Sequence, residues 1–153
     1  MKTSTATDLI TSRANPLVKK IRALRDSRAR TEAGLFLVEG IHPVGEALDA
    51  GWEIEALVYA PEKLRSRHAL DMLSRFTGRK ERITASLFET VAERDNPQGI
   101  LAVVRKADRS LADLGGVTRA VALDTPQDPG NLGTIIRTLD AVKGDAVFVL
   151  DGG

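Results

Sequence analysis

One stretch near the end of the sequence combines turn-forming residues with a cation in a pattern that can hold an anion. Asp128-Pro129-Gly130 has turn chemistry, because Pro fixes φ and Gly allows positive φ, and Asn131 stands where a helix N-cap is expected. Arg137 follows Gly133 by four residues on the same helical face, and helical side chains lean toward the N-terminus. The guanidinium can therefore lie over the bare glycine, toward a helix start that already favours phosphate.

The residue types leave one alternative open for Arg137 and exclude several other chemistries for the chain. Arg137 could instead pair with Asp140 or Asp128 on the surface of an ordinary helix. A dinucleotide site or P-loop is excluded, because the glycine spacing is not G-x-G-x-x-G and no Gly-Lys-Ser/Thr occurs. The absence of cysteine excludes a disulfide scaffold, a thiolate zinc site and a cysteine nucleophile. His42, at a predicted helix start, and His68, on a charged helix face, are too few for a metal site, so we expect no metal.

Charge is distributed unevenly along the 153 residues, although the net charge is only +1. Residues 1–30 contain eight Lys and Arg against two Asp, so a basic N-terminal segment precedes a mildly acidic body. Basic clusters of this kind contact polyanions, because they neutralise phosphates and release condensed counterions. The alternative is a solvated helix face. If the partner is a nucleic acid, the residues expected to contact it are Arg13, Lys19, Lys20 and Arg25.

These residues must be positioned by secondary structure, which the apolar spacing predicts. Asn15-Pro16 reads as the N-cap and first position of an amphipathic helix of about 15 residues that ends near Gly34. Further helices are expected over 43–50, 61–74, from a capping box beginning at Ser86, and from about Asn131. Strands are expected over 35–38, 54–60, 80–84, 100–104, 119–123 and 146–150. Strands alternating with helices predict an α/β fold with layers and a mainly parallel sheet.

The string LDTPQDPGNLGTIIRTLDAVKGD closely resembles the first conserved motif of the SpoU/TrmH family of RNA ribose 2′-O-methyltransferases. The matching positions are Asp128, Pro129, Gly130, Asn131, Gly133, Arg137 and Thr138. Lys143 departs from the family pattern at the helix exit. Upstream, Phe36-Leu-Val-Glu-Gly40, Ala47-Leu48 with Gly51, residues 54–58 and Pro97-Gln-Gly-Ile100 resemble the family's L30e-like substrate-binding domain.

The resemblance implies a fold and a domain order. It implies an L30e-like α/β/α domain over residues 1–106, a linker over 107–118, and over 119–153 the first β-α-β of a SPOUT (trefoil-knot) methyltransferase domain. The family's two later motifs, which build the cofactor-binding knot, have no counterpart here. We therefore expect a truncated chain without a cofactor site, inactive alone and at most able to bind RNA.

The resemblance also implies an activity. It implies methyl transfer from S-adenosyl-L-methionine to a ribose 2′-hydroxyl, most plausibly in ribosomal RNA, by a cytoplasmic enzyme that dimerises. Arg137 sits at the catalytic arginine and Asn131 at a conserved asparagine. A guanidinium is a poor base at neutral pH, so Arg137 either accepts the 2′-OH proton in a special environment or positions a phosphate; we favour positioning. The alternatives are a non-catalytic L30e-like RNA-binding module and a generic nucleotide-binding α/β protein.

Three further residues are assigned from the sequence. We expect Glu39 to cap or orient the turn that follows the strand at 35–38, and His42 to be a turn residue. Trp52, beside Gly51, is expected at the rim of the core, with base stacking as the alternative. No run approaches the roughly 18 apolar residues of a membrane span, and no membrane contact is expected.

Overall fold

The computed structural model describes residues 8–108 and 110–150, which divide into a first compact unit up to Ala107 and a second that begins at Asp108. The first unit contains a four-stranded sheet in the order β1-β4-β2-β3. Its strands are β1 (Leu35–Glu39), β2 (Ile54–Tyr59), β3 (Lys80–Arg82) and β4 (Ile100–Arg105). Its helices are α1 (Pro16–Ala23), α2 (Ser27–Ala33), α3 (Ile41–Asp49), α4 (Arg67–Arg75) and α5 (Ala85–Glu89).

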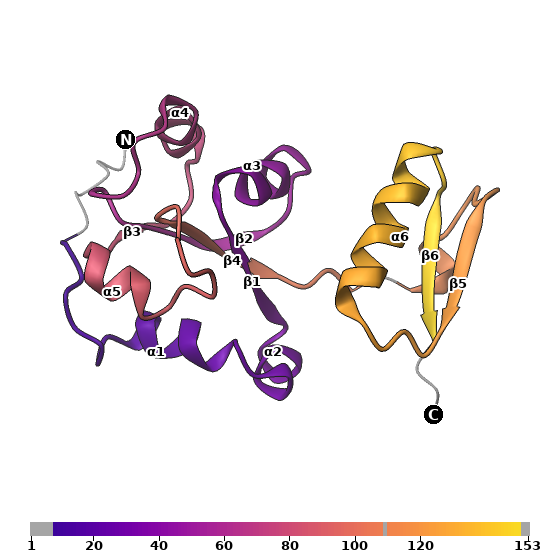
Figure 1. Cartoon of the computed structure of the whole chain (residues 1–153), viewed down its shortest axis with the longest axis horizontal. Helices are drawn as coiled ribbons and strands as arrows, with labels where there is room; N and C mark the ends of the chain where they lie inside the picture. Colours follow the sequence, from indigo (N-terminus) through magenta and orange to yellow (C-terminus); the bar gives the residue numbers. More distant parts are fainter. Residues whose placement is uncertain (1–7, 109, 151–153) are drawn as a thin grey trace. The chain divides into compact units, whose positions relative to one another are not determined.

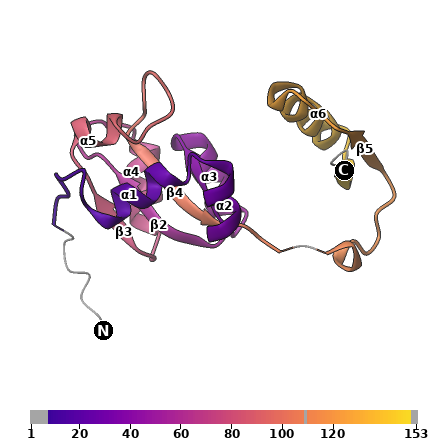
Figure 2. The same ribbon diagram turned by 90° about the horizontal axis from the view of Figure 1, so that it is seen from below.

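Helices cover both faces of this sheet, which gives the expected α/β/α layers. Figure 1 shows α1, α2 and α5 on one side and α3 and α4 on the other; in Figure 2, α1 lies in front of the strands. The central strand β4 is buried on both faces: Leu101 and Val103 pack with α1 and α5, while Ile100 and Ala102 pack with α3 and α4. Its continuous apolar run therefore supplies both cores.

The predicted mainly parallel sheet is wrong for the first unit. Strand β4 is antiparallel to both β1 and β2, and only β2 and β3 run parallel. The apolar run of β4 correctly indicated burial on both faces, but burial does not depend on strand direction. Strand β4 enters between β1 and β2 from the irregular segment 90–99, and its antiparallel direction had no local signal.

The predicted single N-terminal helix is two helices. Helix α1 begins as expected, with Asn15 accepting the N–H of Leu17 and Pro16 at the first position. The chain then breaks at Leu24, because the Asp26 carboxylate accepts the N–H of Ala29 and starts α2. Helix α2 ends at Gly34, whose φ of 62° gives the left-handed cap that glycine favours.

Two other helices begin at different residues from those predicted. The helix expected from Pro61 begins only at Arg67, after a turn over 61–63. The helix expected to be capped by Ser86 is capped by Thr84, which accepts the N–H of Leu87. The capping hydroxyl is thus two residues earlier than the sequence pattern indicated.

The second unit is a β-α-β element preceded by a single 3-10 turn, η1 (Leu111–Asp113). Strands β5 (Ala120–Asp124) and β6 (Ala146–Leu150) pair in parallel, with Val121 opposite Val147. Helix α6 (Pro129–Ala141) connects them. Among the described residues, no helix is long and apolar enough to cross a membrane.

Candidate functional site

Helix α1 presents its cations from a firmly docked position. Its apolar stripe, formed by Leu17, Val18 and Ile21, is buried against the sheet. Lys19 lies on the exposed side, and Arg13 is exposed just before the helix. Within the described part of the chain, neither side chain makes a hydrogen bond or ion pair, so both charges are available to a ligand.

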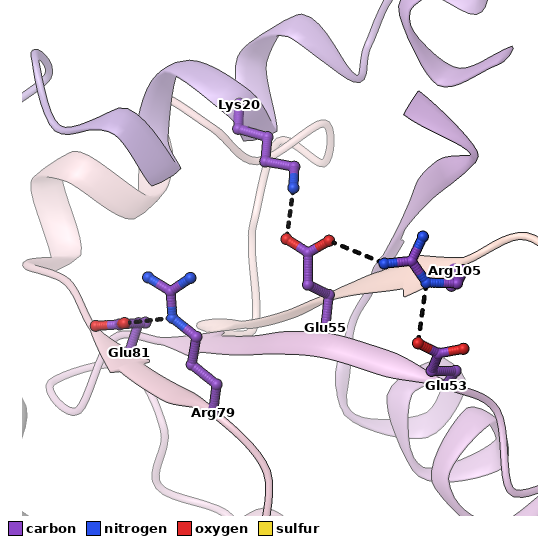
Figure 3. A network of polar contacts seen from close by, with 6 residues as sticks. All are labelled: Lys20, Glu53, Glu55, Arg79, Glu81 and Arg105. Carbon is purple, nitrogen blue, oxygen red and sulfur yellow. Dashed lines mark hydrogen bonds and ion pairs between the residues drawn. The ribbon is translucent and has the colours of Figure 1, made fainter. Parts of the chain in front are cut away.

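The other two cations predicted to contact nucleic acid are engaged within the protein. Figure 3 shows that Glu55 on β2 forms ion pairs with both Lys20 and Arg105. Its Oε2 lies 3.7 Å from Arg105 Nη2. Arg25 donates from Nη2 to the carbonyl oxygen of Ala92. The structure therefore separates the predicted set of four into two available cations and two that tie α1 to the rest of the unit.

Arg22 is an available cation that the predicted set omitted. It is exposed, has no side-chain partner among the described residues, and follows Lys19 by three positions, which places the two on neighbouring parts of one helix face. Arg30, by contrast, donates to the carbonyls of Leu24 and Arg25 at the end of α1. The helical spacing from Lys19 was the sequence signal that could have included Arg22.

In the second unit, the turn before α6 is organised by Asp128. Its carboxylate accepts the N–H of Gly130 at 2.8 Å and caps a helix that begins at Pro129. The prediction that Asn131 is the N-cap is wrong, because Pro129 already has the fixed φ that suits a first helical position. Asn131 lies in the first turn of α6 and is exposed.

Arg137 adopts the geometry that the sequence predicts. A Cβ atom built on Gly133 would lie 3.3 Å from Nη1 of Arg137, so the guanidinium lies directly against the bare glycine. Its Nη2 donates to Thr134 Oγ1 at 3.0 Å. Among the described residues Arg137 makes no ion pair, and the alternative pairing with Asp128 or Asp140 is not found. The cation therefore points back along α6 toward its start with its charge unneutralised.

The exit from α6 accommodates the departure from the family pattern at Lys143. Lys143 has a φ of 56°, in the left-handed region, and its N–H bonds to the carbonyl of Asp140. Gly144 then donates to the carbonyl of Leu139 at 2.8 Å, and any Cβ at 144 would collide with the Leu139 side chain. The lysine thus takes the left-handed position, and the glycine is required by packing.

Asp145 fastens the starts of the two strands together. Its Oδ2 accepts the backbone N–H groups of Thr118 and Arg119, each at 2.9 Å, and the Thr118 hydroxyl. The hydrogen bond from the backbone N–H of Arg119, followed by those from the backbone N–H and the hydroxyl of Thr118, lowers the pKa of the Asp145 carboxyl from its ordinary value of 3.8. This carboxylate therefore has a structural task, although no sequence motif pointed to it.

Glu39 orients a different loop from the expected one. Its Oε2 accepts the N–H of Glu93 at 2.7 Å and so holds the segment before β4. His42 is exposed at the start of α3, beside Glu46. Trp52 is 51% exposed and meets Phe36 edge-on, with ring centroids 5.6 Å apart, which confirms its position at the rim of the core.

Residues 8–108 and 110–150 contain no group of three or more potential metal ligands. A groove of the second unit lies apart from the turn that Arg137 faces. The groove beside α6, about 310 Å³, is lined by Ile136, Leu139, Asp140 and residues 144–147. It therefore lies at the amino end of β6, whereas Arg137 points toward the turn that follows the carboxyl end of β5.

Comparisons with known proteins identify the family. The MRM3-like substrate-binding domain matches residues 15–102. The 23S rRNA (guanosine(2553)-2′-O)-methyltransferase RlmP of Bacillus subtilis is 34% identical over 148 residues, covering 94% of this chain and 54% of the relative. A 23S rRNA (uridine(2479)-2′-O)-methyltransferase of Streptomyces viridochromogenes is 34% identical over 146 residues, covering 92% and 50%.

Solved structures agree with these relatives. An rRNA methyltransferase from Sinorhizobium meliloti superposes with a TM-score of 0.79 at 36% identity, covering 96% of this chain and 56% of that one. The SpoU methyltransferase AviRb of Streptomyces viridochromogenes, in complex with AdoMet, gives 0.78 at 29% identity, covering 88% and 52%. The chain thus spans about half the length of the curated relatives it matches. It belongs to the SpoU/TrmH family of RNA methyltransferases and contains the family's MRM3-like substrate-binding domain.

Proposed function

We propose that this chain supplies the RNA-binding unit and the arginine-bearing motif of an enzyme that methylates a ribose 2′-hydroxyl in ribosomal RNA. The relatives named above are rRNA 2′-O-methyltransferases, and their similarity extends through both units of this chain. S-adenosyl-L-methionine would supply the methyl group when bound to the complete enzyme. The proposal assigns the 153 residues themselves to substrate binding and substrate positioning.

The observation that carries the proposal is the placement of Arg137. An unneutralised guanidinium lies against Gly133 and points toward the start of α6, where backbone N–H groups also favour an anion. A guanidinium remains protonated at neutral pH and donates in a planar fork that matches a phosphate. Arg137 therefore binds the phosphate beside the target ribose and orients its 2′-hydroxyl, with Asn131 contributing from the first turn of the same helix.

The basic surface of the first unit binds RNA phosphates other than the one beside the methylated ribose. Arg13 and Lys19 contact phosphates with exposed side chains that have no partner among the described residues, while Lys20 and Arg25 contribute to the field around α1 from within their protein contacts. Phosphate contacts set the position of the RNA but do not read its sequence. The identity of the modified nucleotide must depend on other residues.

The experiment measures methyl transfer from labelled S-adenosylmethionine to ribosomal RNA by the full-length enzyme. Arg137→Ala is expected to abolish transfer while RNA binding persists. Lys143→Gln, which removes a cation just beyond the far end of α6, is the control and is expected to retain activity. Near-native turnover of Arg137→Lys would contradict the proposal, because a compact ammonium lacks the planar fork.

A narrower role is proposed for the 153 residues by themselves, which is RNA binding without methyl transfer. The described groove of the second unit does not lie at the turn that Arg137 faces, so these residues are not expected to hold the methyl donor. Calorimetry of this chain with S-adenosylmethionine should detect no binding, and a micromolar affinity would refute this role. We further propose that the complete enzyme is a homodimer, which sedimentation at equilibrium tests.

A further inference from the structure

Glu39 at the end of β1 has one carboxylate oxygen that the fold leaves without a partner. Oε2 accepts the N–H of Glu93 at 2.7 Å. Oε1 is buried and, within residues 8–108 and 110–150, accepts no hydrogen bond. A buried carboxylate oxygen without a donor is among the costliest groups to retain in a protein, and such an exception needs an explanation. The hydrogen bond from Glu93 thus satisfies Oε2 and leaves Oε1 unexplained.

The neighbourhood of Glu39 provides donors whose hydrogen-bonding capacity is unused. Gln98 Oε1 accepts the N–H of Ile41 at 2.9 Å, and this leaves the amide NH₂ of Gln98 without a partner among the described residues. Arg94 is exposed and likewise makes no hydrogen bond or ion pair there. Both side chains lie beside Gly40: a Cβ built on Gly40 would be 3.1 Å from Gln98 Oε1 and 3.7 Å from Arg94 Nη1.

The backbone places Glu39 next to the loop that carries Arg94 and Gln98. Gly40 has a φ of 108°, a conformation that residues with a side chain rarely adopt, and a Cβ would also press on Gln98. Glu39 lies opposite Leu101 in the β1–β4 register, so the end of β1 and the loop before β4 are neighbours. An acceptor without a donor therefore lies next to the loop that carries a cation and an amide.

We propose that this junction binds an unpaired guanine of the RNA substrate, with Glu39 accepting the hydrogen bonds of the base and Arg94 contacting an adjacent phosphate. The inference rests on the proposed RNA-binding function. On its pairing edge guanine presents two adjacent donors, N1–H and N2–H₂, whereas adenine, cytosine and uracil each place an acceptor beside their donor. A carboxylate offers only acceptors, so it repels that neighbouring acceptor and favours guanine. Unpaired bases are the usual targets of sequence-specific RNA recognition.

The side chains beside Gly40 can make room for the base. Arg94 is held by no partner among the described residues, and Gln98 by one hydrogen bond, so both can move toward a bound nucleotide at small cost. A purely structural Glu39 makes a different prediction. In that case its replacement would loosen the segment held through Glu93, lowering stability and weakening the binding of every RNA alike.

The experiment measures binding of this chain to single-stranded nonamers of uridine that contain a central guanosine, inosine or adenosine. We expect guanosine to bind roughly ten-fold more tightly than adenosine, with inosine between them because it keeps N1–H and lacks the amino group. In Glu39→Gln the preference for guanosine should fall below about two-fold, while the melting temperature is unchanged or higher, because a carboxylate with one buried oxygen that lacks a donor becomes a neutral amide.

Two further variants separate the contributions. Arg94→Gln should weaken binding of all three RNAs and keep the preference, with a salt slope shallower by about 0.7, the value for one lost contact to single-stranded RNA. Glu62→Gln is the matched control, because Glu62 also accepts a backbone N–H, that of Ala85 at 2.7 Å, and among the described residues no hydrogen bond joins it to Glu39, Arg94 or Gln98. It should retain both affinity and preference.

Specific outcomes overturn the inference. If the wild-type chain binds none of the RNAs, the proposed RNA-binding function itself fails. If it binds all three equally, or if Glu39→Gln keeps the preference, only the guanine site fails. A lowered melting temperature in Glu39→Gln together with an equal loss of affinity for every RNA would assign Glu39 a structural role alone.

Discussion

Two double variants with the same change in charge test whether the protein contacts of the α1 cations decide their role in RNA binding. Arg13→Gln/Lys19→Gln removes two cations without partners among the described residues, whereas Lys20→Gln/Arg25→Gln removes two cations that are engaged with Glu55 and with a backbone carbonyl. Each pair lowers the net charge by two. Any difference between the pairs therefore reports geometry and not total charge.

The expected magnitudes follow from counterion release. Each phosphate contact to a single strand contributes about 0.7 to the slope of log K against log salt, which corresponds to about five-fold in affinity at 0.1 M salt. Arg13→Gln/Lys19→Gln should therefore lose about 1.4 in slope and roughly 25-fold in affinity. Its stability should change by less than about 0.5 kcal/mol, since these exposed side chains have no described partner in the protein.

The engaged pair should behave in the opposite way. Lys20 is 38% exposed, so its ion pair with Glu55 contributes only about 0.2–1 kcal/mol. The hydrogen bond from Arg25 to Ala92 adds about 1 kcal/mol. We expect Lys20→Gln/Arg25→Gln to lose about 1–2 kcal/mol in urea unfolding and less than half of the slope lost by the other pair.

The assay is fluorescence anisotropy with a labelled single-stranded RNA at four or more salt concentrations, accompanied by urea titration of each variant. If both double variants lose equal slope, total charge governs binding and the distinction between available and engaged cations is refuted. A slope of zero for the wild-type chain would refute phosphate contact altogether.

Three further predictions concern other parts of the chain. Asp145→Asn should destabilise the second unit at neutral pH. Because the pKa of Asp145 is lowered in the folded state, the carboxylate contributes its full stabilisation above pH 3.8 and loses it as the pH falls through the lowered pKa. Amide exchange near Arg119, measured as a function of pH, tests this. Gly99→Ala should destabilise the first unit by about 1–3 kcal/mol in urea unfolding, because Gly99 has a φ of 79° and a Cβ there would lie 2.6 Å from Lys63 Cβ; an unchanged midpoint would contradict this. Trp52→Ala should cost about 1–2 kcal/mol and leave RNA affinity within about two-fold, since a half-exposed ring at the core rim contributes packing, and a ten-fold loss of affinity would instead favour base stacking.

Features that depend on neighbours in the sequence were predictable. The stripe of Leu17, Val18 and Ile21 predicted which face of α1 is buried, because the helical period alone determines that face. The contact of Arg137 with Gly133 was predictable for the same reason, since residues four apart in a helix are spatial neighbours whatever the rest of the chain does.

Features that depend on strand order were not predictable from these patterns. The direction of β4 is set by its insertion between β1 and β2, which are separated from it by long stretches of sequence. The predictions of two N-cap residues were wrong for a local reason. Thr84 and Ser86 both carry a hydroxyl that can cap a helix, and Asp128 and Asn131 both carry a side-chain acceptor. Backbone geometry determined which residue of each pair is the N-cap. Residue type alone did not distinguish the members of either pair.

The division of the basic residues combines both kinds of dependence. Lys19 and Lys20 are adjacent and chemically identical, and the sequence prediction treated them alike. The helical period turns them about 100° apart, so Lys20 faces the sheet side and meets Glu55, which is 35 positions away, while Lys19 faces outward. The position of Glu55 depends on β2 pairing with β4, and with it the availability of Lys20. When a nucleic-acid-binding surface is inferred from charged residues along a sequence, the cations that the tertiary fold pairs with carboxylates must therefore be left out of it.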